Sequence, residues 1–69
     1  MKYIVIELQT NSEGVVGNLV YSYDERNAAE SKYHTILAAA AVSQLPTHAA
    51  VLLTSDGEYI AAQKYEHGE

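Results

Sequence analysis

Alternation of apolar and polar residues predicts two pairs of β-strands, one at each end of the chain. β-Branched and tyrosine residues recur at every second position in these segments, and polar turn-forming residues separate the two strands of each pair. Residues 11–14 form the first turn, and the second contains Asp56 and Gly57, a dipeptide typical of a two-residue hairpin loop. The predicted strands are approximately residues 2–10, 15–23, 48–54 and 58–65.

The segment between the two hairpins, approximately residues 25–44, has the spacing of an amphipathic helix. Its apolar residues recur every three or four positions, which places them on one side of a helix. Asp24 and Asn27 are alternative caps at the start, and Pro46 ends the helix. The side chains expected on its buried side are Ala29, Tyr33, Ile36, Leu37, Ala40 and Ala41.

Together these elements predict one α+β domain, residues 1–69, with a ββαββ order. An eighteen-residue helix and an eight-residue strand are both roughly 27 Å long, so one helix covers one face of the sheet. A right-handed crossover between the second and third strands gives a four-stranded antiparallel sheet of order 2-1-3-4. We expect the polar residues 66–69 to fray, with His67 in solvent.

The sheet face without a helix is the predicted binding surface. In the first strand, Tyr3 and Val5 lie on this face if Ile4, Ile6 and Leu8 face the helix. All six aromatic residues of the chain are tyrosines, which are common at interfaces because they combine apolar area with a polar tip. Packing of the tyrosines around the rim of the core is the alternative. The expected interface or ligand-binding residues are Tyr3, Val5, Glu7, His48, Leu52, Tyr59 and Tyr65.

Composition adds an expectation of self-association. The 69 residues include no cysteine, which excludes disulfides and thiolate metal sites. A single core of this size rarely contributes more than about 3–5 kcal/mol, so we expect a homo-oligomer. Four basic and nine acidic residues give a net charge of −5, which argues against direct binding to nucleic acid.

The same sequence features argue against membrane association and secretion. The longest apolar run, residues 36–42, is too short to span a bilayer. Residues 1–10 lack the pattern of a signal peptide. We therefore expect a cytoplasmic protein without a membrane partner.

Residues that could support catalysis or metal binding are few. Gly14 and Gly17 do not form a phosphate-binding loop. Glu30 and His34 are four residues apart on the predicted helix and could reach one metal ion, but two ligands do not make a site. A nucleophilic centre would need a pocket that one helix on one sheet rarely encloses. We expect no enzymatic activity, no cofactor and no metal.

A resemblance covers most of the chain. In the segments KYIVIELQT, VGNLVYSYD, AESKYHTILAAAAVS and HAAVLLTSDGEYI the sequence resembles a group of small uncharacterised proteins of phages and mobile elements in Firmicutes. The resemblance implies a genetic context and assigns no role to any residue. It implies an accessory protein that binds a host factor or sequesters a small signalling molecule.

The leading hypothesis is a non-enzymatic, self-associating binding module that engages a protein partner through the helix-free sheet face. The resemblance makes a host protein the expected partner, and a phage accessory or host-modulating role the expected context. One alternative is an oligomeric binder of a nucleotide signal, with Tyr3, Tyr59, Tyr65 and His48 lining a pocket between subunits. A second alternative is an acidic mimic that inhibits a nucleic-acid-binding host protein.

Overall fold

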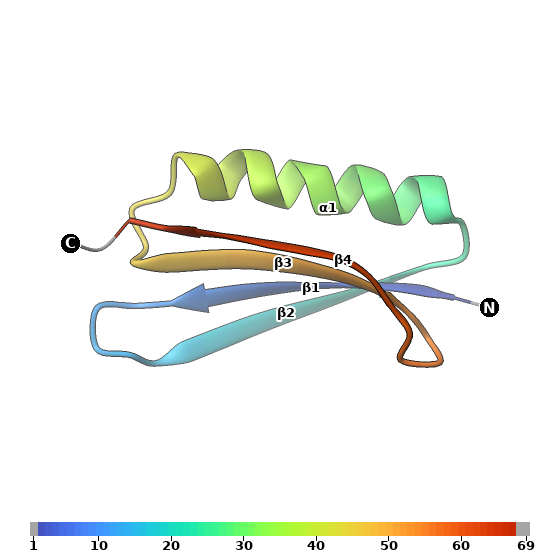
Figure 1. The fold of residues 1–69 in the computed structure, drawn as a ribbon, viewed down its shortest axis with the longest axis horizontal. Coiled ribbons are helices and arrows are strands. Elements are labelled where there is room, and N and C mark those ends of the chain that lie inside the picture. The colour runs from blue at the N-terminus through green and yellow to red at the C-terminus, as the bar shows by residue number, and fades with distance from the viewer. Residues whose placement is uncertain (1, 68–69) are drawn as a thin grey trace.

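A computed structural model describes residues 2–67, and Met1, Gly68 and Glu69 lie outside the described residues. One helix lies along one face of a four-stranded antiparallel sheet (Figure 1). The strand order β2-β1-β3-β4 confirms the predicted α+β fold and topology. The elements are β1 (Tyr3–Thr10), β2 (Val16–Tyr23), α1 (Arg26–Ala41), β3 (Thr47–Thr54) and β4 (Tyr59–Glu66).

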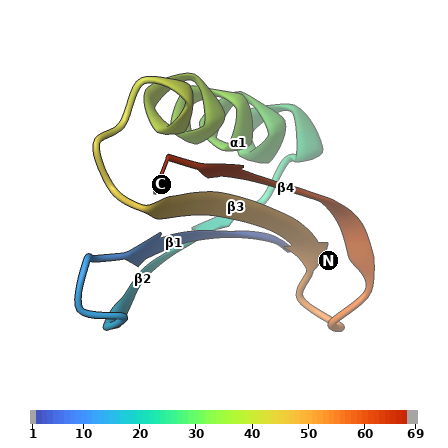
Figure 2. The same cartoon turned by 60° about the vertical axis from the view of Figure 1, so that its left-hand side comes forward.

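The molecule has only two layers. Figures 1 and 2 show α1 on one side of the sheet, and no other described segment crosses the opposite side. The principal extents are 39 × 20 × 15 Å, and the radius of gyration is 12.1 Å. A compact domain of this length would have a radius of gyration of about 11 Å. The shape is therefore slightly elongated, as expected for a single helix laid on a sheet.

The core lies between α1 and the two central strands. The predicted buried side of α1 is confirmed at Ala29, Tyr33, Ile36 and Ala40, which are buried, and Leu37 packs against them, whereas Ala41 is exposed. The sheet contributes Val5, Ala50 and Leu52 to the same core. Because Ala50 is small, the larger side chains of α1 fit between helix and sheet.

The ends of α1 differ from the predicted caps. The helix begins after Glu25, whose side chain makes no capping hydrogen bond, and Asp24 pairs instead with Lys2. At the other end, Nε2 of His67 lies 2.7 Å from the carbonyl oxygen of Ala40. The same carbonyl accepts a hydrogen bond from the N–H of Ser43 at 3.2 Å, so His67 is a second partner at the end of the helix.

The predicted fraying is wrong for residues 66 and 67. Glu66 is the last residue of β4, and the backbone N–H of His67 donates to the carbonyl of Pro46 at 2.8 Å. The prediction for residues 68–69 falls outside the described part of the chain.

Both hairpins turn through three residues, of which the last is a glycine with positive φ. The φ angle is 83° at Gly14 and 88° at Gly57, a conformation that glycine adopts without steric cost. In the first turn, Oδ1 of Asn11 also accepts hydrogen bonds from the N–H groups of Glu13 and Val15. A type I turn followed by such a glycine is a standard three-residue hairpin connection.

The second hairpin differs by one residue from the predicted two-residue loop. The N–H of Thr54 donates to the carbonyl of Glu58 at 2.9 Å, so three residues form the loop. A β-bulge at Ile60 then adds one residue to β4 and reverses the shift. Beyond the bulge Val51 lies opposite Ala62, as predicted.

Candidate binding surface

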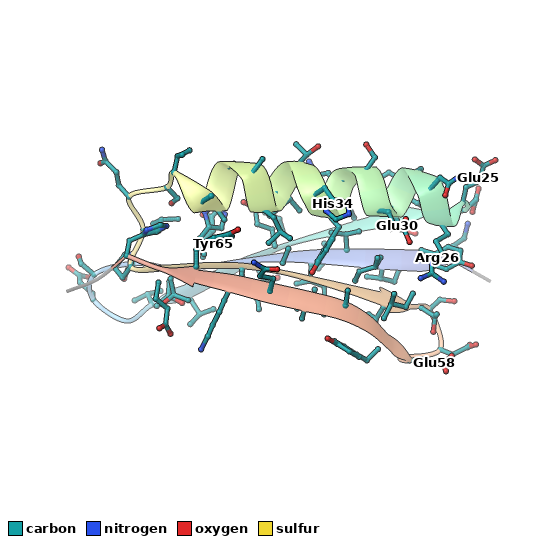
Figure 3. The ribbon with its side chains drawn as sticks, turned by 45° about the horizontal axis from the view of Figure 1, so that its top comes forward. Glu25, Arg26, Glu30, His34, Glu58 and Tyr65 are labelled. Carbon is teal, nitrogen blue, oxygen red and sulfur yellow. The ribbon has the colours of Figure 1, made fainter. Side chains whose placement is uncertain are left out.

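The structure places most of the predicted site residues under the helix. Val5 and Leu52 are completely buried, and His48 is 5 % exposed. Figure 3 shows Tyr65 on the side of β4 that faces α1, and the register pairs Tyr65 with His48. The prediction that these residues line the helix-free face is therefore wrong. The members that lie on the helix-covered side are Tyr3, Val5, Glu7, His48, Leu52 and Tyr65.

Tyr59 is the exception, because the bulge at Ile60 changes its side. Sequence alternation groups Tyr59 with Leu52, but the register places it opposite Leu53. Its side chain is 67 % exposed. Tyr59 is thus the one predicted site residue that lies at the margin of the helix-free face.

The error originates in β1, where both alternating sets contain apolar residues. Ile4, Ile6 and Leu8 form the more apolar set, yet they face away from α1, and Val5 and Glu7 face it. The hydrogen bond from His48 on the neighbouring strand offsets the cost of burying the carboxylate of Glu7 beneath the helix. The alternation within β1 alone does not indicate which of the two sets faces the helix.

The helix-free face is formed by the side chains of alternate residues that point away from α1. Its aliphatic members run across all four strands and meet in the middle at Ile6 and Val51, which lie opposite each other. Val16 and Val20 at one edge are 58 % and 59 % exposed. The residues of the helix-free face are Ile4, Ile6, Leu8, Thr10, Val16, Asn18, Val20, Ser22, Thr47, Ala49, Val51, Leu53, Tyr59, Ala62, Lys64 and Glu66.

The charged side chains of the helix-free face lie in one corner. Nζ of Lys64 is 3.2 Å from Oε2 of Glu66, and both residues are on the edge strand β4. A shallow hollow of about 280 Å³ lies next to them, between β3 and β4. It forms where Ala49 and Ala62 leave space between larger neighbours. The rest of the face is apolar or uncharged.

The size of the helix-free face is that of a functional apolar patch. Eight-residue strands are roughly 26 Å long, and four strands span about 14–19 Å, which gives the whole face, its polar residues included, an area of roughly 360–500 Å². The largest apolar patch on a typical monomer measures about 300–600 Å² and often has a function. The face therefore has the extent and the chemistry of a contact surface.

The polar pair under α1 forms a second cluster, distinct from the helix-free face. Oε2 of Glu7 lies 2.7 Å from Nε2 of His48 and accepts a hydrogen bond from Nε2 of Gln9 at 2.9 Å. Nδ1 of His48 is buried and has no partner among residues 2–67. The hollow between β3 and β4 is not lined by this pair. We interpret the pair as part of the core, with one ring nitrogen of His48 left without a partner among the described residues.

Two opposing effects set the pKa of Glu7. Burial raises the pKa, whereas hydrogen bonds from His48 and Gln9 and the nearby charges of His48 and Lys32 lower it. The lowering effects prevail, so the pKa of Glu7 lies below its ordinary value of 4.5. The carboxylate form is therefore the one that the fold stabilises.

The remaining candidate groups do not form a site within one chain. Tyr3 and His48 lie at opposite ends of the β1–β3 pair, so the aromatic pocket of the ligand-binding hypothesis is not assembled. Figure 3 shows Glu30 beside Arg26, whose Nε is 2.7 Å from Oε2 of Glu30. In residues 2–67 no three histidine, cysteine or acidic side chains gather as metal ligands.

The fold and this surface define a class: a two-layer α+β domain with an uncovered apolar sheet face. Comparison with family models, curated proteins and solved structures finds no match to the chain. The resemblance to phage and mobile-element proteins therefore stays a prediction. Within the described residues, α1 has neither the length nor the apolar character to cross a membrane.

Proposed function

We propose that this chain is a non-enzymatic binding module that engages a protein partner through the helix-free face. The observation that carries the proposal is a continuous aliphatic surface with no covering segment from residues 2–67. Leaving such a surface in water is unfavourable, because burial of apolar area contributes about 25 cal/mol per Å². A partner that covers it gains this free energy.

The charges around the face indicate the chemistry of the partner. Glu13 lies in the loop at one end of the sheet, and Asp56 lies in the loop at the other end. A partner with apolar side chains at its centre and lysine or arginine at its rim would match this pattern. An amphipathic protein segment has this arrangement. A host protein with such a segment is the partner that the phage resemblance favours.

The substitution Val51→Lys tests the proposal, because it places a charge in the middle of the face. We expect amphipathic peptides, selected from a random library on the wild-type protein, to bind the variant at least about tenfold more weakly, since the unpaired charge would be buried. Fluorescence anisotropy with the selected peptides measures this difference. The matched control is Val42→Lys, because Val42 is 82 % exposed just beyond α1 and outside the face.

Two results would contradict the proposed function. One is a selection that enriches no apolar peptide on the wild-type protein. The other is equal binding of the enriched peptides to the wild type and to Val51→Lys. Circular dichroism of both variants establishes that each is folded before binding is compared.

A further inference from the structure

The two edges of the sheet differ in their protection against pairing with another strand. The edge strand β4 carries Lys64 and Glu66 and is interrupted by the bulge at Ile60. Charges and bulges are the devices by which proteins prevent edge-to-edge association. The other edge, β2, has eight residues without a charge, a proline or a bulge. β2 is therefore an open edge.

The backbone of β2 offers a regular row of free hydrogen-bonding groups. The N–H of Asn11 donates to the carbonyl of Val15, which fixes the odd-numbered residues of this strand as those bonded to β1. The even-numbered residues then direct their N–H and C=O groups outward. These outward residues are Val16, Asn18, Val20 and Ser22.

The helix leaves this edge accessible. Leu19 lies on the helix side of β2, yet it is 50 % exposed. The core sits over β1 and β3, where Val5 and Leu52 are completely buried. A strand can therefore approach β2 without displacing α1.

We propose that β2 pairs in antiparallel fashion with β2 of a second copy of this chain, about a two-fold axis. A register centred on Leu19 uses all the outward residues of both strands. It joins the two sheets into one and leaves both helices on the same side. The pairs are Val16 with Ser22, Gly17 with Tyr21, Asn18 with Val20, and Leu19 with Leu19 of the other copy.

The side chains of β2 are complementary to themselves in this register. Leu19 meets its own copy on the two-fold axis, which buries apolar area that is exposed in the monomer. Gly17 lies opposite Tyr21, and an aromatic ring across from a strand glycine stabilises a sheet. None of the residue pairs between the two copies of β2 contains a charged residue. Self-pairing of β4 about Lys64 would instead bring like charges together.

This pairing would also enlarge the contact surface. The two helix-free faces would lie side by side on one continuous sheet, with a combined area of roughly 800–1,000 Å². A stable protein–protein interface uses about 800 Å² on each partner. The paired form would therefore reach the size of a standard interface, which one chain does not. The pairing itself does not depend on the proposed function.

Val20→Pro tests the pairing with little disturbance of the monomer. Proline removes an N–H that points outward, and edge strands accept proline at such positions. Two hydrogen bonds are lost, one in each copy. We expect the dissociation constant of the dimer, measured by sedimentation velocity, to rise at least about tenfold, which corresponds to roughly 1.4 kcal/mol. Ala62→Pro removes an outward N–H from the other edge and is the matched control.

The outcomes separate this inference from the proposed function. We expect Val51→Lys to weaken peptide binding and to leave the dimer intact. We also expect the outward amide of Val20 to exchange with solvent more slowly as protein concentration rises, and that of Ala62 to be unchanged. A wild type that stays monomeric at high micromolar concentration would overturn the pairing. So would a dimer that Ala62→Pro disrupts and Val20→Pro does not.

Discussion

Glu7 and His48 place two polar side chains inside a small core, and each is the hydrogen-bond partner of the other. Leaving one of them buried alone would cost about 1–3 kcal/mol. A carboxylate only accepts hydrogen bonds, so Nε2 of His48 is the donor to Oε2 of Glu7. The pair therefore fixes how β1 and β3 sit together under α1.

Replacing Glu7 should reduce the acid sensitivity of the fold. Because the folded pKa of Glu7 lies below 4.5, its carboxylate stabilises the fold above that pH, and this contribution is lost as pH falls through the folded value. Urea unfolding from about pH 7 to about pH 3 measures the loss. We expect a smaller decrease in the free energy of unfolding for Glu7→Gln than for the wild type.

The matched control for this measurement is Glu13→Gln, because Glu13 is exposed in the first hairpin loop. Its unfolding free energy should follow the pH dependence of the wild type. Parallel curves for Glu7→Gln and the wild type would show that the buried pair is not the origin of the acid sensitivity.

At the scale of elements, the periodicity of the sequence predicts the helix and the four strands, but not which face of the sheet α1 covers. The helix pattern identified Ala29, Tyr33 and Ile36 correctly, since a three- and four-residue spacing has only one buried side. The pattern of β1 does not identify its buried side, because both the odd-numbered and the even-numbered residues include apolar side chains that can be buried. The choice depends on a contact between strands, that of Glu7 with His48, which no single-strand pattern contains.

The consequence for the candidate site is direct. Placing Ile4, Ile6 and Leu8 on the helix side puts the opposite set of β1 on the open side, and the structure has the reverse arrangement. Layer counting still predicted correctly that one sheet face is uncovered. The identity of that face required the register of β1 against β3.

The second hairpin should depend on the conformation of Gly57 and not on the space around it. A Cβ atom at this position would meet nothing within 4 Å, so the cost of a side chain comes from the φ angle of 88°. We expect Gly57→Ala to lower the free energy of unfolding by about 1–2 kcal/mol. Gly57→Asn should cost less, because asparagine tolerates this conformation better. Thermal and urea unfolding of the two variants compare these values, and an equal loss for both would exclude the conformational explanation.

At the scale of the whole molecule, acidic loops and an apolar face have opposite effects on solubility. The net charge of −5 gives the copies a mutual repulsion near neutral pH that opposes association through their helix-free faces, and the sequence has a pI of about 5.0. Near that pH the repulsion vanishes while the helix-free face remains apolar. The balance between the two features is therefore set by pH.

Solubility should reach a minimum near pH 5.0. Turbidity across a pH series measures this minimum, and Val51→Thr should make it shallower, because it reduces the apolar character of the face without a change in charge. Val42→Thr is the control outside the face and should behave as the wild type. A minimum of equal depth in both variants would show that association at low net charge does not involve the helix-free face.

The bulge at Ile60 has a consequence for how the chain tolerates changes in length. Compared with a two-residue turn, the three-residue turn shifts the pairing of β4 with β3 by one residue, and the bulge shifts it back. The inner half of the hairpin therefore has the pairs that a two-residue turn without a bulge would give. Deleting Ile60 alone would join Tyr59 to Ala61 in a regular ladder and leave the inner pairs, such as Val51 with Ala62, unchanged. A deletion further along β4 has no extra residue to absorb it, so it would turn the rest of the strand to the opposite side of the sheet. The outer half of this hairpin therefore tolerates the loss of one residue, and the inner half does not.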